Sequence, residues 1–330
     1  VVIPLERLGD YSDGIERINI ELSIGNKLKL LAAFEEFFRG DLPLHQHEET
    51  VSATELIGDR IERARSLVED TRRRWQWLLD NLDTPLEAMK DENGRRKAEE
   101  AGFSSSLIPS LNEMYPSGPS SFATDGNVWH LLQDHTLRVS WKEEVRAPLA
   151  DIFSGRAFHK VVEQIDALHQ SVLRGRVFVA LHAHAGDGNV HTNIPVNSDN
   201  YEMLQEASQA VARIMRLAQS LDGVISGEHG IGITKMDFLS PEKIHEFETY
   251  KQKVDPDGHF NKGKLLAGAN LDNAYTPSFA LLGTESLILE QSEIGTISDS
   301  VKDCLRCGKC KPVCATHVPR ANLLYSPRNK

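Results

Sequence analysis

The chain has 330 residues, of which 40% are hydrophobic and 26% are charged, and its formal net charge at pH 7 is -11. This length is enough for one large or two ordinary domains, and the hydrophobic content is not in the range of disordered chains. Phosphate binding rests on clustered Lys and Arg, so the acidic balance argues against nucleic acid as a partner. Apolar runs such as the one from Val177 are too short to span a membrane.

The first half of the chain is predicted to be mainly helical. Residues 1–5 predict a short buried strand, and residues 12–38 predict a helix because apolar side chains recur there at helical spacing. A second helix is predicted over residues 48–82, where arginines lie within pairing distance of acidic residues and form a solvent-exposed face. Further elements are predicted as helices over residues 89–101, 131–149 and 158–173 and as a loop over residues 104–127.

From Arg176 the apolar pattern changes from that of a helix to that of a strand. The residues Gly186–Asn189 favour a tight turn, and a second strand follows from Val190, so this region predicts a β-hairpin. The order of elements predicts an α+β fold, in which helices cover one face of an antiparallel sheet. The remaining predicted elements are a helix over residues 201–220, a strand over residues 223–228 and a helix over residues 241–253.

Histidines flank the predicted hairpin turn on both strands. His184 ends the first strand and His191 lies on the second, so two imidazoles can approach one point. Imidazole is a common ligand of borderline metals such as zinc or manganese. Glu228, in the glycine-rich segment GEHGIG, is the candidate third ligand, and two His with one Glu is a pattern of open, catalytic sites. His229 would then be free to accept a proton.

From the residues alone, a plainer interpretation stays open. Each histidine can be an ordinary hydrogen-bonded residue, and the turn can be only a good hairpin turn. His182 alternates onto the same face as His184, and we interpret it as a neighbour of the ligands rather than as a ligand.

Three motifs in order resemble the C-terminal substrate domain of the FAD-linked oxidase family: HAGDGNVHTN from His184, SGEHGIG from Ser226 and DPDGHFNKGKLL from Asp255. That family includes D-lactate, glycolate and D-2-hydroxyglutarate dehydrogenases and is related in fold to vanillyl-alcohol oxidase. The opening VVIPLERLGD also resembles a strand and helix start of that domain. The resemblance covers residues 1 to about 38 and residues 176 to about 268.

The resemblance implies a role for individual residues. His184, His191 and Glu228 match the metal ligands of the family, Asn193 matches a residue that contacts the substrate, and His229 matches the catalytic base. It also implies a ferredoxin-like substrate (cap) domain and FAD as the hydride acceptor. The activity implied is oxidation of a D-2-hydroxy acid, of the lactate, glycolate or 2-hydroxyglutarate type, to the 2-oxo acid.

The chain departs from the family pattern in two ways. In this chain, Lys262 stands where the family's Asn-Pro-Gly-Lys turn has its proline. The long helical block from about 40 to 170 has no counterpart in simple members of the family. We expect the FAD-binding domain to lie upstream, so that the chain is a fragment. The expected domains are a substrate domain over residues 1–39 and 174–270, a helical insertion over 40–173, a linker over 271–300 and the start of an iron–sulfur module over 301–330.

All cysteines of the chain, which are Cys304, Cys307, Cys310 and Cys314, lie in one short segment. Their spacing, C-x₂-C-x₂-C-x₃-C, is that of bacterial-type ferredoxins, in which the first three cysteines bind one 4Fe-4S cluster and the fourth binds another. The usual proline after the last cysteine is Ala315 here. The missing ligands are expected beyond Lys330.

Together these features predict part of an FAD-dependent 2-hydroxy-acid dehydrogenase that passes electrons from flavin to iron–sulfur clusters. The expected electron acceptor is a quinone, a cytochrome or another redox protein, and the expected location is the cytoplasm or the inner face of the cytoplasmic membrane. The alternative is a metal- or cluster-binding regulatory module without catalysis.

Overall fold

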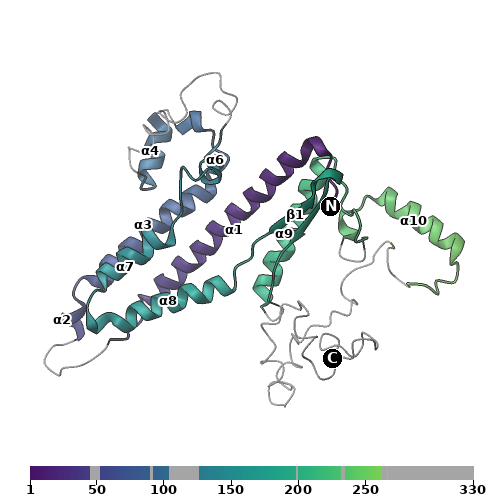
Figure 1. Cartoon of the computed structure of the whole chain (residues 1–330). Helices are drawn as coiled ribbons and strands as arrows, with labels where there is room; N and C mark the ends of the chain where they lie inside the picture. The colour runs from purple at the N-terminus through teal and green to yellow at the C-terminus, as the bar shows by residue number, and fades with distance from the viewer. Residues whose placement is uncertain are drawn as a thin grey trace, which may run out of the picture. The chain divides into compact units, whose positions relative to one another are not determined.

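The structure is a computed structural model (Figure 1) that describes residues 1–44, 53–89, 92–103, 126–197, 200–231, 235–261 and 266. The chain divides into two compact units. One unit comprises Val1–Ile15 and Val177–Lys330, and the other comprises Glu16–Arg176. The described residues are mostly helical and contain one small antiparallel sheet, which agrees with the α+β class.

The unit Glu16–Arg176 is built from helices that follow the long helix α1 (Leu8–Phe37). In Figure 1, α3 and α7 lie side by side within this unit. Its described α-helices after α1 are α2 (Ala53–Ile57), α3 (Arg60–Asp80), α4 (Glu92–Glu100), α6 (Val128–Gln133), α7 (Ala147–Ile152) and α8 (His159–Arg174). Short 3₁₀ turns occur in this unit at Leu86–Met89 and Arg156–Phe158, and a π-helical turn at Lys142–Arg146; a further 3₁₀ turn, Leu5–Arg7, precedes α1 in the other unit.

Two predicted helices are interrupted. The helix predicted over residues 48–82 breaks at Gly58, whose φ of +53° ends α2 before α3 begins, because glycine adopts this left-handed conformation readily. The prediction of one helix over residues 131–149 is wrong in its middle part, because α6 ends at Gln133 and a non-helical turn follows. There, His135 has a φ of +63° and the amide of Leu137 donates to the carbonyl of Leu131 (2.7 Å), which turns the chain away from the helical path.

Aromatic side chains form the core of this helical unit. Phe34 is fully buried, with its ring stacked on Trp141 at a centroid distance of 5.4 Å and tilted against Phe38 at 6.3 Å. The buried indole of Trp75 donates to the carboxylate of Glu144 at 3.1 Å. A buried indole N–H therefore has its hydrogen-bond partner, as expected in a well-packed core.

Replacing Phe34 by alanine should destabilise the helical unit by about 3–5 kcal/mol, because the lost contacts leave a cavity that the neighbouring rings only partly fill. Urea unfolding followed by circular dichroism measures this. The matched control is Phe260→Ala, since that ring is 71% exposed and its loss should change stability by less than about 0.5 kcal/mol. Equal effects of the two substitutions would contradict the core assignment.

The second unit contains the predicted hairpin. Strand β1 (Ala180–His184) pairs antiparallel with β2 (Asn189–Asn193), with His182 opposite His191 and His184 opposite Asn189. The 3₁₀ turn Ala185–Asp187 joins them, followed by Gly188 with a φ of +67°. A Cβ atom at Gly188 would collide with the carbonyl oxygen of Ile3, so this turn has no room for a side chain.

The start of the chain extends the pairing beyond the hairpin. Val2 bridges to Asn189 on one side and to Val224 on the other, with reciprocal backbone hydrogen bonds of 2.8 and 2.7 Å to Val224. The strand predicted over residues 223–228 is therefore reduced to a single bridge at Val224. This pairing nevertheless fixes the segment that leads to Glu228 beside β2.

Two helices complete this unit. Helix α9 (Tyr201–Ser220) has the predicted bounds, and the side chain of Asn200 caps it by accepting from the amide of Met203 at 3.0 Å. Helix α10 (Pro241–Val254) begins after Ser240 with Pro241 in its first turn, as predicted. A further 3₁₀ turn spans Met236–Phe238.

Asp255 holds the loop that follows α10. Its carboxylate accepts from the amide of His259 at 2.8 Å, from the amide of Phe260 at 3.1 Å and from the ammonium of Lys251 at 2.9 Å. These donors favour the charged form, so the Lys251 hydrogen bond first and the two amides next hold the pKa of Asp255 below its ordinary value of 3.8.

We expect Asp255→Asn to lower the free energy of unfolding at neutral pH and to remove part of its acid dependence. A carboxylate with a lowered folded-state pKa stabilises the protein above its unfolded-state pKa, and this contribution is lost as the pH falls through the folded value. Urea unfolding at several pH values between 7 and 2 should therefore show wild type and variant converging in acid. A constant difference across this range would contradict the assignment.

Within the described residues, no helix is long and apolar enough to cross a membrane.

Candidate metal centre

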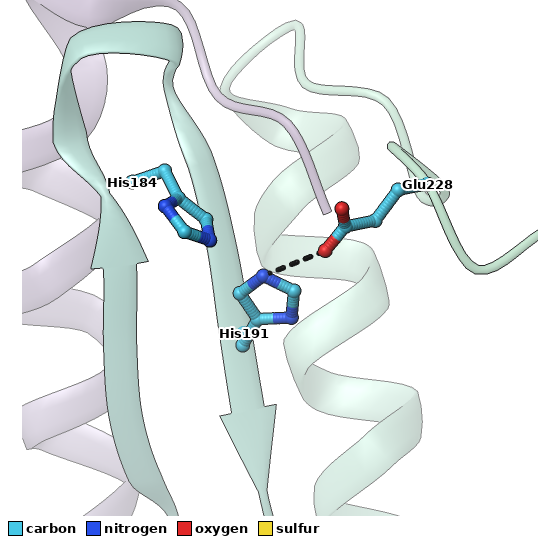
Figure 2. Close-up of side chains that lie close together, drawn as sticks. All are labelled: His184, His191 and Glu228. Atoms are coloured by element: carbon cyan, nitrogen blue, oxygen red, sulfur yellow. Dashed lines mark ion pairs between the residues drawn. The ribbon is translucent and has the colours of Figure 1, made fainter.

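The hairpin register brings two of the predicted ligands to one face of the sheet. His184 is the last residue of β1, and His191 is the middle residue of β2, where it pairs with His182. Side chains two residues apart on a strand share a face, so His182 and His184 lie on the same side of β1. Figure 2 shows the rings of His184 and His191 on neighbouring strands, directed toward each other. Their centroids lie 5.5 Å apart, with one ring edge-on to the other.

Glu228 approaches this pair from a separate segment. Its Oε1 lies 2.9 Å from Nε2 of His191, the contact marked by the dashed line in Figure 2. Ligand atoms of His184, His191 and Glu228 all lie within 4.8 Å of one another. Among the described residues, this is the group of histidine, cysteine and carboxylate side chains that could hold a metal ion.

Close backbone packing places Glu228 at this point. A Cβ atom on Gly227 would lie 2.7 Å from Cγ2 of Val2 and 2.9 Å from Oδ1 of Asn189. Only a residue without a side chain allows the segment to pass so near β2 and the first residues of the chain. Gly227 thus allows the close approach that the sequence motif suggested.

The neighbours of Glu228 and His191 shift the pKa values of both side chains. A hydrogen bond from Asn189, followed by the attraction of His191 and His229, lowers the pKa of Glu228. The side chain of His191 is 17% exposed, and partial burial together with the neighbouring imidazoles lowers its pKa, while Glu228 raises it. A carboxylate kept charged and an imidazole kept neutral are the protonation states that bind a metal ion.

The separations suit a divalent ion. Zinc bonds of about 2.0–2.2 Å to nitrogen and oxygen place tetrahedral ligand atoms roughly 3.3–3.5 Å apart. The His191–Glu228 contact would open by roughly half an ångström from 2.9 Å, and the widest separations would close. The donor set of two imidazoles and one carboxylate leaves positions for a substrate oxygen.

His229 lies beside the candidate ligands but differs from them in exposure. Its side chain is 71% exposed, its Nε2 lies 3.3 Å from Oε1 of Glu228, and its ring stands edge-on to His191 at 5.3 Å. The side chain therefore lies next to the candidate ligands and is open to solvent.

Asn193, the predicted substrate contact, lies on the same strand as His191 and is exposed. Its amide nitrogen lies 3.1 Å from Nδ1 of His182. The four candidate iron–sulfur ligands lie outside the described residues: Cys304, Cys307, Cys310 and Cys314. The same is true of Lys262, Gly263 and Lys264, in the turn where the sequence departs from the family pattern.

Asn189 is the residue whose contribution the sequence reasoning missed. The motif suggested only that it holds the turn, yet its side chain hydrogen-bonds Glu228 and its Nδ2 lies 3.4 Å from Nε2 of His191. It therefore touches two candidate ligands at once, and such partners orient metal ligands. The pairing of Asn189 with His184 across the hairpin could have indicated this, because opposite residues share a face.

Residues 140–265 match the family model described as FAD linked oxidases, C-terminal domain. His184, His191, Glu228 and His229 all lie inside the matched region. The match begins within the helical unit and supports an FAD-linked oxidoreductase as the class of protein that this segment comes from.

Curated relatives carry names of the same kind. The chain is 38% identical over 88 residues to the mitochondrial D-lactate dehydrogenase [cytochrome] of Arabidopsis thaliana, covering 26% of this chain and 16% of that protein. It is 38% identical over 90 residues to D-2-hydroxyglutarate dehydrogenase of Stutzerimonas stutzeri, covering 26% and 19%. It is 37% identical over 116 residues to the glycolate oxidase subunit GlcD of Escherichia coli, covering 34% and 22%.

The aligned segments thus span about a fifth of the length of these relatives. No solved structure matches the chain significantly.

Proposed function

We propose that this chain supplies the metal-bearing, substrate-facing side of an FAD-linked dehydrogenase that oxidises a D-2-hydroxy acid to the 2-oxo acid. The observation that carries the proposal is the convergence of His184, His191 and Glu228, with His229 beside them, inside the segment similar to the FAD linked oxidases. The relatives named for D-lactate, glycolate and D-2-hydroxyglutarate support the substrate class.

Each residue has a distinct task under this proposal. His184, His191 and Glu228 hold a zinc or manganese ion, which when bound would orient the carboxylate and hydroxyl oxygens of the substrate. His229 takes the hydroxyl proton, because its ring lies next to the candidate ligands and its side chain is 71% exposed. FAD, when bound, would supply the hydride acceptor.

Asn193 contacts the substrate under this proposal. It lies on β2 two residues from His191, on the same face of the hairpin, and its amide nitrogen lies 3.1 Å from Nδ1 of His182. The surrounding domain is proposed to be a ferredoxin-like cap domain over residues 1–39 and 174–270, with residues 40–173 as an insertion and residues 271–300 as a linker.

The cysteine segment would transfer electrons from the reduced flavin to an acceptor. Cys304, Cys307 and Cys310 have the spacing that holds three corners of a 4Fe-4S cluster, and Cys314 would serve a second cluster. Such clusters pass electrons singly, so they would connect the two-electron flavin to a quinone, a cytochrome or another redox protein.

Anaerobic mixing of the complete flavoprotein with single 2-hydroxy acids tests the proposal. D-lactate, glycolate or D-2-hydroxyglutarate should bleach the absorbance of the oxidised flavin, and L-lactate should leave it unchanged. A protein whose flavin is reduced by none of these acids, while a chemical reductant still bleaches it, would favour a non-catalytic metal- or cluster-binding module instead.

A further inference from the structure

His182 lies against the candidate site without belonging to the ligand cluster. It is the cross-strand partner of His191, and the two rings stack at a centroid distance of 4.8 Å with an angle of 9° between their planes. This nearly parallel contact borders one face of the His191 imidazole. The ring of His182 therefore restricts how the ring of a candidate metal ligand can turn.

The same side chain also holds the predicted substrate contact. Nδ2 of Asn193 lies 3.1 Å from Nδ1 of His182. An amide nitrogen can only donate, so Nδ1 of His182 accepts this hydrogen bond and the ring proton sits on Nε2. With its nitrogen directed to His182, the amide of Asn193 has its oxygen Oδ1 as the acceptor left for another partner.

We propose that His182 is a positioning residue for the oxidation, which sets the ring of His191 by stacking and the amide of Asn193 by accepting its hydrogen bond. This inference rests on the proposed function. Oδ1 of Asn193 then accepts a hydrogen bond from the substrate, for which the hydroxyl group of a 2-hydroxy acid is a suitable donor. The two contacts of His182 predict two separable effects, one on metal binding and one on substrate turnover.

Two variants at this position separate the contacts. His182→Phe keeps an aromatic ring to stack on His191 but removes the acceptor for Asn193. His182→Asn keeps an acceptor atom, Oδ1, near the place of Nδ1 but removes the ring. Each variant is therefore the control for the other.

Manganese titration of the chelator-treated complete flavoprotein measures the first effect. His182→Asn should weaken manganese binding by about tenfold or more, because residues that orient a metal ligand commonly have effects of this size. His182→Phe should bind manganese within about twofold of wild type. Weaker binding in the Phe variant than in the Asn variant would overturn the stacking half of the proposal.

Steady-state kinetics at saturating manganese measure the second effect. His182→Phe should lower kcat/KM about tenfold, whereas His182→Asn should retain it to within about threefold. In an Asn193→Ala background, His182→Phe should have no further effect, since the amide it orients is gone. A merely structural role would instead give the same loss in both backgrounds, and that additive result would overturn the proposal.

Failure of the proposed function gives a different result. If the parent flavoprotein oxidises no 2-hydroxy acid, the proposed function and the Asn193 half of this inference are both rejected. The manganese titration still decides the His191 half, because its readout is independent of turnover.

Discussion

Replacing His229 by alanine should lower the kcat of the complete flavoprotein by about 10²–10⁴-fold while its flavin content stays unchanged. A positioned proton acceptor contributes this much to a reaction in which a hydroxyl proton leaves. His229 is the exposed imidazole next to Glu228, 3.3 Å from its carboxylate, and its removal leaves the candidate ligands in place. Turnover with the best D-2-hydroxy acid, at saturating substrate and metal, is the measurement.

His245→Ala is the matched control for this prediction. His245 is an exposed histidine on α10, and its alanine variant should turn over at the wild-type rate. Unchanged turnover of the His229→Ala protein would reject His229 as the base and would require another acceptor for the hydroxyl proton.

The double variant His184→Ala, His191→Ala should lose the metal ion. We expect near one equivalent of zinc or manganese per wild-type site and close to none in the variant, since one carboxylate alone is a weak ligand set. Loss of a bound ion also removes its contribution to stability, so added metal should raise the melting temperature of the wild type only. Elemental analysis after dialysis, together with thermal unfolding, gives both readouts.

Two histidines on helices outside the site provide the comparison. The His159→Ala, His245→Ala variant removes the same number of imidazoles and should keep its full metal content. Equal metal content in the two double variants would mean that the ion, if present, is bound elsewhere in the chain.

The local features of the site follow from the sequence. Alternating side chains and the turn residues Gly186–Asn189 predict the hairpin, and the hairpin alone brings His184 close to His191. The bounds of α9 were also predictable, because its apolar positions recur at helical spacing between clear turn residues. In each case the information lies within a few residues of the element.

The non-local features do not follow from the sequence. Glu228 reaches His191 because Val2 pairs with both Asn189 and Val224, a contact between segments that lie nearly the whole described chain apart. No periodic pattern predicts such a pairing. The motif indicates Glu228 as a candidate ligand but does not predict which backbone contacts bring it to His191. The break at Gly58 and the turn at His135 were missed for a related reason, since a left-handed residue interrupts an otherwise continuous helical pattern.

X-ray absorption at the zinc edge of the zinc-loaded chain tests the proposed metal centre most directly, because nitrogen and oxygen ligands give a different first shell from the thiolates that the cysteine segment offers to zinc. Binding at His184, His191 and Glu228 predicts a first shell of nitrogen and oxygen at about 2.0–2.2 Å, with the outer-shell scattering of two imidazoles. Replacing the four cysteines by serine should leave this spectrum unchanged. A sulfur shell at about 2.3 Å that disappears with the cysteines would place the ion in the cysteine segment and contradict the metal centre.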